Sequence, residues 1–147
     1  MITVRIESLG EVRGELEPLL WAHYDEVALY KDSVPLDVDW ERYAALDQRG
    51  MLKVFTVRSG ETLVGYAVFF VGPHMHYRRT SYANNDVLFV HPRYRGAGIR
   101  LIRFAERALK EMGVERILFH VKVDHDFRPI LHRMGYADED VIVGKLL

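Results

Sequence analysis

One stretch of the chain, residues 87–100, constrains the fold more than any other. Residues 87–90 are apolar and typical of a buried strand, and a helical pattern begins soon after Pro92. The segment between them is rich in arginine and glycine: Arg93, Arg95, Gly96, Gly98 and Arg100. Amides at a helix N-terminus and the helix dipole favour a bound anion, and glycines let a large anion approach the main chain. The order strand, glycine turn, helix therefore predicts a cradle for pyrophosphate.

The spacing of these residues excludes two common kinds of phosphate-binding motif. A third glycine, needed for the dinucleotide fingerprint G-x-G-x-x-G, and the Lys-Ser/Thr pair of the P-loop are both missing. Arg95, Gly98 and Arg100 instead fit Q/R-x-x-G-x-G/A, with arginine at the last, normally small, position. In this pattern the segment resembles the acyl-CoA binding motif of the GNAT family of N-acetyltransferases. Leu131–Tyr136 is similar to the closing motif of that family, Y-x-K-x-G-F, and the likeness extends over about residues 50–147.

Hydrophobic periodicity predicts one domain over residues 1–147 with a mixed α/β fold. The expected strands are 2–6, 52–58, 62–71, 81–90, 117–123 and 141–146, and the expected helices are 11–30, 40–49, 101–112 and 126–134. Asp39 is the expected N-cap of the second helix, and Ser59-Gly60 is the expected turn of the first hairpin. The first helix is predicted from residues that recur at helical spacing: Leu16, Leu19, Leu20, His23, Val27 and Tyr30. This order, β-α-α-β-β-β-α-β-α-β, is the order of the resembled family. The resemblance thus implies the acyl-CoA N-acyltransferase fold, a twisted mixed sheet flanked by helices. We expect the strand–helix–strand unit at 81–123 to be parallel, with the ligand at the strand carboxyl ends.

Composition and charge bear on the class of ligand. The chain has no cysteine, which excludes disulfides, a thiolate metal site and a cysteine nucleophile. Residues 1–92 carry 9 Lys/Arg against 13 Asp/Glu, whereas residues 93–133 carry 10 against 5. A solvated basic helix face is one interpretation, but the excess begins at the glycine turn and therefore favours an anionic ligand such as CoA. We expect no nucleic-acid partner, because no aromatic-basic RNA motif is present.

The start of the chain and its hydropathy suggest where the protein works. The sequence has no apolar run of about 18 residues, the length that a membrane-spanning helix needs. Residues 1–5 do not resemble a signal peptide. We therefore expect no membrane association and a cytoplasmic location.

The resemblance implies two sets of contacts to acetyl-CoA, used as a co-substrate. Backbone groups of the strand before the glycine turn would hold the pantetheine and the thioester, and the turn would hold the pyrophosphate. These positions are Leu88, Phe89, Val90, Arg95, Gly96, Ala97, Gly98, Ile99 and Arg100.

Asp86 is the acid on the strand that leads to the glycine turn, where family members often place a carboxylate base. With Asn84 it should share the face of Leu88, by the period of two. Partial desolvation would raise the pKa of Asp86 and let it take a proton through water. The alternative is a polar residue at a strand irregularity. Asn and Asp are depleted in strands, so Asn84-Asn85 suggests that the strand bulges or lines a cavity.

Two further candidates lie outside that strand. His76 follows a strand and could bind the acceptor or relay a proton, although plain loop packing is the simpler interpretation. The pair His74 and His76 has no third ligand at a suitable spacing, and the resembled family needs no metal, so we expect none. Glu26, with Asp25, would attract a cationic amine if its helix forms a wall of the acceptor pocket, as the resemblance implies. An ordinary solvated helix face is the alternative.

The closing helix departs from the family pattern. The family's proton-donating tyrosine falls at Leu131, which cannot donate a proton. Either His132, one residue on, replaces it, or the thiolate leaves without an acid.

Together these features predict an N-acetyltransferase that moves an acetyl group from acetyl-CoA to a primary amine by direct attack in a ternary complex. No nucleophile for a covalent intermediate is evident. The alternatives are a non-catalytic CoA-binding or interaction protein on the same fold, and a relative that uses another activated donor such as aminoacyl-tRNA. The acceptor stays open, and so does pairing into a homodimer through exposed strand edges.

Overall fold

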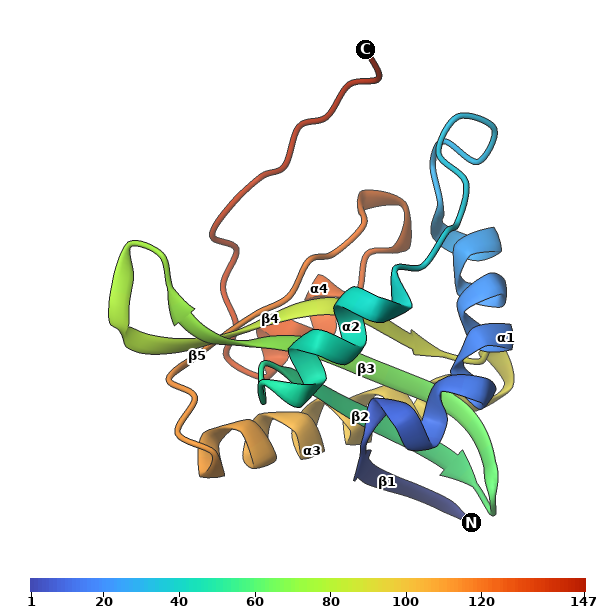
Figure 1. Ribbon diagram of the computed structural model, residues 1–147, viewed down its shortest axis with the longest axis horizontal. Helices are drawn as coiled ribbons and strands as arrows, with labels where there is room; N and C mark the ends of the chain where they lie inside the picture. The colour runs from blue at the N-terminus through green and yellow to red at the C-terminus, as the bar shows by residue number, and fades with distance from the viewer.

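The computed structural model describes all of residues 1–147 (Figure 1). The strands are β1 (Ile2–Glu7), β2 (Leu52–Ser59), β3 (Thr62–His74), β4 (Tyr77–Val90) and β5 (Arg116–Leu118). The helices are α1 (Leu9–Val27), α2 (Trp40–Gln48), α3 (Gly98–Glu111) and α4 (Arg128–Arg133), with short 3-10 turns at Pro92–Ala97 and Val123–His125. The strands form one sheet in the order β1-β2-β3-β4-β5, antiparallel except for the parallel pair β4 and β5. The mixed α/β fold with a parallel pair at its end is thus confirmed.

None of the helices has the length and apolar character that a membrane crossing requires.

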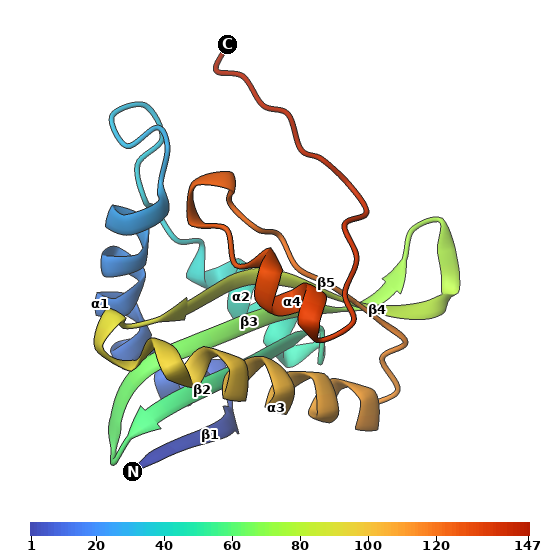
Figure 2. The same cartoon turned by 180° about the vertical axis from the view of Figure 1, so that it is seen from behind.

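Helices cover both faces of the sheet. α1 and α2 lie on one face, where Leu9, Val12 and Leu16 pack on a cluster that includes Leu52 and Tyr66. α3 lies on the opposite face, seen from behind in Figure 2, and buries its apolar stripe there. Side chains of one strand therefore alternate between two separate clusters, which is the period-two pattern of a sheet covered on both sides.

Local signals in the sequence explain where several elements begin and turn. Asp39 caps α2 as predicted, because its Oδ1 accepts a hydrogen bond from the Arg42 amide at 2.9 Å. The β2–β3 hairpin turns at Gly60, whose φ of +61° is a conformation that favours glycine. Both features were expected from the sequence and are confirmed.

Two strand predictions need correction. The strand expected at 117–123 is only Arg116–Leu118, because β5 pairs with β4 over three residues and then diverges from it. The strand expected at 141–146 is wrong: these residues pair with nothing and lead away from the body in both views (Figures 1 and 2). Their apolar run, residues 141–143, favours a strand, but it makes no ladder hydrogen bonds with any strand of the sheet, so no strand forms there.

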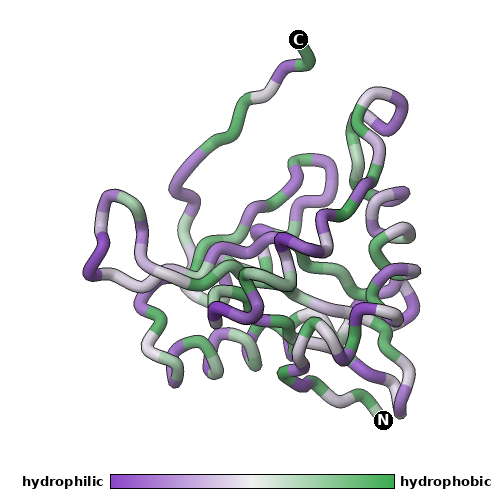
Figure 3. Tube along the Cα trace, in the orientation of Figure 1, coloured by the Kyte–Doolittle hydropathy of each residue, from purple (hydrophilic) through white to green (hydrophobic).

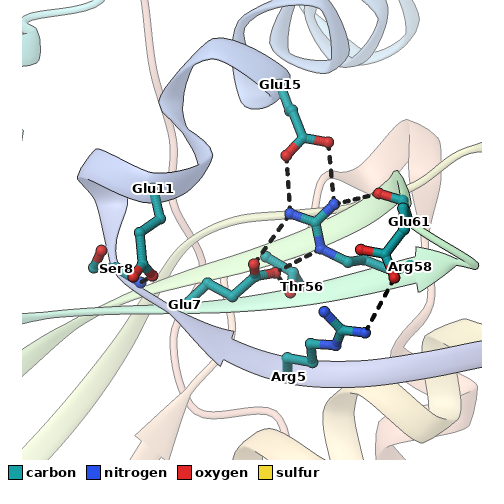
Figure 4. Close-up of polar contacts among 8 residues, drawn as sticks. All are labelled: Arg5, Glu7, Ser8, Glu11, Glu15, Thr56, Arg58 and Glu61. Atoms are coloured by element: carbon teal, nitrogen blue, oxygen red, sulfur yellow. Dashed lines mark hydrogen bonds and ion pairs between the residues drawn. The ribbon is translucent and has the colours of Figure 1, made fainter.

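A charged network under α1 joins three elements (Figure 4). The Arg58 side chain on β2 lies almost entirely out of solvent, with the residue 5% exposed. Its Nε donates to Glu7 at 2.9 Å, its Nη2 donates to Glu15 at 2.9 Å, and its Nη1 donates to the Glu61 carbonyl at 2.6 Å. These hydrogen bonds from Arg58 lower the pKa values of the Glu7 and Glu15 carboxyls. The guanidinium therefore links β1, α1 and β2 through bonds that fill its donor positions.

Gly65 on β3 permits a close approach of β4 just before the glycine turn. A Cβ at this position would lie 2.9 Å from the Phe89 carbonyl oxygen and 3.2 Å from the Val90 Cα, both backbone atoms. We expect Gly65→Ala to lower the free energy of unfolding by about 1–3 kcal/mol, measured by urea denaturation, because β4 must shift. Gly72→Ala on the same strand is the control: its nearest contact is the Met51 Cε at 3.6 Å, and the change should stay within about 0.5 kcal/mol. Equal effects of the two variants would contradict this account.

Candidate active site

Four polar side chains from four elements meet on the sheet face that α1 and α2 cover. This polar cluster consists of His23 on α1, Tyr43 on α2, Tyr66 on β3 and Asp86 on β4. The Tyr43 hydroxyl donates a hydrogen bond to Asp86 Oδ2, and His23 Nδ1 lies 3.2 Å from the Tyr66 hydroxyl. Burial raises the pKa of Tyr66, and Tyr43 and Asp86 act electrostatically in the same direction, so the two pairs are electrostatic neighbours. Convergent polar groups on an otherwise apolar face are typical of a functional site.

A bulge in β4 places Asp86 in this cluster. Val68 pairs with Val87 and Phe69 pairs with Asn85, so Asp86 is an extra residue without a partner on β3. Asn85 is 4% exposed, and its Nδ2 donates to the carbonyl oxygens of Val68 at 3.3 Å and Val87 at 2.9 Å. The bulge expected from Asn84-Asn85 is confirmed, and the Asn85 side chain bonds to one carbonyl on β3 and to one on β4 beyond the extra residue.

Because of the bulge, one prediction about the two faces of the sheet is wrong. Asp86 was expected on the face of Leu88, but it contacts Tyr43, whereas Leu88 packs against the cluster under α3. Residues two apart in a regular strand lie on the same face, but the residue inserted at the bulge puts Asp86 and Leu88 on opposite faces. Asp86 instead shares its face with Phe89.

The environment of Asp86 suits a proton acceptor. Burial raises the pKa of its carboxyl, while the hydrogen bond from Tyr43 and the charge of His120, which follows β5, act in the opposite direction. Burial and the bond to Asp86 also raise the pKa of Tyr43, so that the phenol keeps its proton. Asp86 is therefore a half-buried carboxylate with a raised pKa, the type of group that serves as a general base.

His23 is a site residue that sequence analysis missed. Its ring stacks on Phe89 with centroids 5.1 Å apart, and burial lowers the pKa of His23 to about 4. The imidazole is therefore neutral near neutral pH. The helical pattern counted His23 as part of the apolar stripe of its helix, and the signal that it differs was its presence as a polar residue within that stripe.

The edge of β4 beyond the bulge is open on the side of β5. The two strands pair only from Tyr82 to Asn84 on β4 and from Arg116 to Leu118 on β5. The backbone at Leu88, Phe89 and Val90 pairs with β3 on its other side. Its outer edge therefore keeps polar groups that an extended ligand could bind.

The glycine turn leaves the start of α3 accessible. A 3-10 turn, Pro92–Ala97, precedes the helix; the Gly98 amide donates to the Arg95 carbonyl, and no side chain caps the start of α3 at Ala97. A Cβ added to Gly96 or Gly98 would meet no atom within 4 Å, so the space beside them is open. Amides at a helix start without a side-chain cap are groups that can bind an anion, and binding of pyrophosphate at this turn stays a prediction.

The arginines of the turn contact other parts of the protein. Arg95 forms an ion pair with Glu26 on α1, and the Arg100 Nη2 donates to the Ile2 carbonyl at 3.0 Å. Arg100 also borders a hollow of about 610 Å³ together with Arg103, Arg107 and Arg133. Contact of Arg95 and Arg100 with phosphate stays a prediction.

The remaining sequence candidates lie apart from the polar cluster. His76 sits in the turn of the β3–β4 hairpin, which projects beyond the body, and its amide donates to His74 Nδ1 at 3.1 Å (Figure 1). That turn is about ten residues from Asp86 along β4, roughly 30 Å at the rise of a strand, so His76 does not reach the cluster. Glu26 lies one turn after His23 and faces Arg95, with His125 Nδ1 at 3.9 Å.

The closing helix places its candidates elsewhere. Leu131 is 4% exposed and packs in the interior, where a tyrosine ring would lack space. His132 Nε2 lies 2.8 Å from Asp138 Oδ1 on the surface, an arrangement that ties down the chain after α4. Among all 147 residues, no group of three or more His, Cys, Asp or Glu side chains is arranged to hold a metal ion.

Comparisons with known proteins agree on a fold. The family model of the acetyltransferase (GNAT) family matches residues 15–136, and no curated protein matches the chain. A transcriptional regulator from Bacillus halodurans C-125 superposes with a TM-score of 0.77 at 20% identity, covering 100% of both chains. An aminoglycoside acetyltransferase from an uncultured soil metagenomic sample gives 0.74 at 18% identity, covering 99% of this chain and 95% of the other. A predicted acetyltransferase with acetyl-CoA from Clostridium acetobutylicum gives 0.70 at 16%, covering 99% and 96%. At these identities the structures show a common fold.

Proposed function

The chain belongs to the acetyltransferase (GNAT) family, whose model covers most of its length, and from this premise we propose that it moves an acetyl group from acetyl-CoA to a primary amine. The observation that carries the proposal is the arrangement along β4. A half-buried carboxylate, Asp86, is followed by an open strand edge at Leu88–Val90 and by the start of α3, which no side chain caps. A proposed base, free backbone groups for the pantetheine and a proposed site for the pyrophosphate thus follow one another along the chain. This is the order in which acetyl transfer from acetyl-CoA would need them.

The residues present fit the parts of acetyl-CoA. The pyrophosphate would lie on the amides of Gly96 to Arg100, and the pantetheine would extend along the open edge of β4. The hollow beside Arg100 offers further guanidinium groups for the remaining phosphate of CoA. With the pyrophosphate and the pantetheine bound in this way, the thioester would lie near the bulge that carries Asp86.

The acyl transfer would then proceed by direct attack. The amine nitrogen attacks the thioester carbonyl carbon, and Asp86 takes the amine proton, directly or through water. The C–S bond of the tetrahedral intermediate breaks, and the thiolate leaves. A thiol has an ordinary pKa of about 8.5, so the thiolate departs near neutral pH with modest help, and Leu131 does not prevent the reaction.

One observation favours a second candidate, a non-catalytic CoA-binding or interaction protein. Both arginines of the motif contact the protein itself, and Leu131 occupies the position of the family's acid. Titration of the chain with acetyl-CoA in a calorimeter, followed by thiol release with a panel of amines, separates the two. We expect binding and one thiol released per acetylated amine. Binding without turnover would favour the second candidate, and absence of binding would exclude both.

The anion site gives a prediction about Arg95. A charge-assisted contact to phosphate contributes about 1.5–3 kcal/mol, so Arg95→Ala should weaken acetyl-CoA binding roughly ten- to a hundredfold in calorimetry. Arg79→Ala removes the same charge from the β3–β4 hairpin and is the matched control, with unchanged affinity expected. Because Glu26 pairs with Arg95, Glu26→Gln should keep or increase the affinity. Parental affinity in Arg95→Ala would place the phosphates elsewhere.

A further inference from the structure

A hollow beside α3 is bordered by guanidinium groups that the protein itself leaves unpaired. Its volume is about 610 Å³, and it is bordered by Arg100, Arg103 and Arg107 of α3 and by Arg133, the last residue of α4. Figure 2 looks onto the face of the sheet that carries these two helices. Arg103, Arg107 and Arg133 are exposed and form no ion pair. A hollow of this volume is large enough for a small molecule.

The arginines of α3 form a stripe along one face of the helix. Arg100, Arg103 and Arg107 lie three and four residues apart, so they are neighbours on the helix surface. The apolar face of α3 packs on the sheet, and the hydropathy trace of Figure 3 shows hydrophilic and hydrophobic residues alternating along its turns. Like charges at this spacing destabilise a helix. A bound anion would remove this repulsion.

Acetyl-CoA, bound as proposed above, would use only one end of the hollow. Its pyrophosphate would lie on the first turn of α3, and its remaining phosphate would lie near Arg100. Arg107 is seven residues beyond Arg100, which is about 10 Å at the rise of a helix. The guanidinium groups of Arg107 and Arg133 are therefore left for a second anion.

The rest of the hollow is not cationic. Apolar surface comes from Val4 on β1, Phe104 on α3 and Met134, which follows α4. Glu106 also borders the hollow: its Oε2 accepts a hydrogen bond from the Tyr136 hydroxyl at 2.8 Å, and its Oε1 accepts none from the protein. A bare polyanion would be repelled by this carboxylate and would leave the apolar surface uncovered. A ligand that carries phosphates, a flat ring and an N–H donor would match all three features.

From these features we propose that the hollow binds a nucleoside polyphosphate whose base carries an amino group, at the same time as acetyl-CoA. The phosphate chain would lie across Arg103, Arg107 and Arg133, whose planar guanidinium groups bind phosphate oxygens through paired N–H donors. The base would cover Phe104, and its amino group would donate to Glu106 Oε1. The inference rests on the residues of the hollow, and it holds whether or not acetyl transfer is the function.

The first test is a calorimetric titration with ATP in a buffer without divalent cations. One ATP should bind to the protein that is already saturated with CoA, because the hollow stays open. Full competition between ATP and CoA would show that the hollow is part of the CoA site, and this result or an absence of ATP binding would overturn the proposal. If the protein binds no CoA, the proposed function fails, yet ATP should still bind. The two failures are therefore distinguishable.

The second test assigns the site to particular side chains. In the same titration, Arg107→Ala and Arg133→Ala should each weaken ATP binding about tenfold, the effect of one lost charge-assisted contact. Arg42→Ala is the matched control, because Arg42 is an exposed arginine without an ion pair on α2, which covers the other face of the sheet. Its affinity for ATP should match that of the parent, and circular dichroism should show all three variants folded. Parental affinity in both variants of the hollow, or an equal loss in the control, would overturn the proposal.

The third test separates a nucleoside from phosphate alone. Inorganic tripolyphosphate has the phosphate chain without the base, and it should bind about tenfold more weakly than ATP. Glu106→Gln keeps an acceptor for the Tyr136 hydroxyl but removes the second carboxylate oxygen, so it should weaken ATP binding and leave tripolyphosphate binding unchanged or stronger. Equal affinity of the parent for the two probes, or an unchanged preference in Glu106→Gln, would overturn the assignment of an amino-bearing base.

Discussion

Replacing Arg58 with alanine should lower the free energy of unfolding by about 3–5 kcal/mol, since it leaves the carboxylate of Glu7, which lies mostly out of solvent, without its counter-charge. The Glu7 side chain is 16% exposed and would lose both its hydrogen bonds to the guanidinium (Figure 4). Glu15 is 45% exposed and can turn to water, so most of the effect should come through Glu7. Urea denaturation near neutral pH measures the difference.

Arg5→Ala is the matched control for this prediction. Arg5 belongs to the same surface region, but its side chain is 45% exposed and its ion pair with Glu61 has a separation of 4.0 Å. Removal of an exposed pair of this kind should cost less than about 1 kcal/mol. A loss as small in Arg58→Ala would mean that the network is not needed for stability.

The same network predicts a dependence on pH with a definite sign. Hydrogen bonds from Arg58 hold the pKa values of Glu7 and Glu15 below their ordinary value of 4.5. A lowered pKa in the folded state stabilises the protein above the ordinary value, and this stabilisation is lost as the pH falls through the lowered one. The difference in stability between the parent and Arg58→Ala should therefore shrink on acidification below about pH 4.5. A constant difference over that range would contradict the role of the carboxylates.

Asp86→Asn should lower the rate of acetyl transfer about a hundredfold or more while leaving acetyl-CoA affinity nearly unchanged. The amide keeps the shape of the carboxyl and can still accept from Tyr43, so the fold should persist. Because burial raises the pKa of Asp86, the acidic limb of the parent's pH–rate profile should lie above the ordinary carboxyl range, and the variant should lack it. Steady-state kinetics over pH, with calorimetry for affinity, test both statements.

Tyr43→Phe supplies the control that separates a base from a structural carboxylate. The Tyr43 hydroxyl lowers the pKa of Asp86, so its removal should move the acidic limb to higher pH and leave the rate at alkaline pH largely intact. A merely structural Asp86 would give no such movement. Unaltered turnover in Asp86→Asn would mean that the amine arrives neutral or that another group takes its proton.

Features that depend on neighbouring residues were predictable from the sequence. The glycine turn before α3, the hairpin at Gly60 and the cap at Asp39 each follow from a few adjacent residues, and Asn84-Asn85 indicated the bulge in β4. The polar cluster was only partly predictable, because its members come from four elements. Asp86 was identified from its strand, but Tyr43 and His23 joined it only once helices and sheet were packed together.

The errors have a related cause. The pattern at 141–146 is that of a strand, and whether it forms one depends on an edge that local sequence does not reveal. β5 ends early because its pairing with β4 ends at Asn84, just before the bulge. Both errors concern pairing between distant segments.

Because of the bulge, the number of residues in β4 determines on which face of the sheet Asp86 lies. If Asn85 were deleted, Asp86 would take its place opposite Phe69, and regular alternation would return while the pairs on either side kept their register. The acid would then share the face of Phe69, which packs under α3, although Asp86 and the other members of the polar cluster were all still present in the sequence. At this strand, therefore, an insertion or deletion of one residue changes the chemistry of the site more deeply than most substitutions, and a relative that differs by one residue here should not be assumed to use the same base.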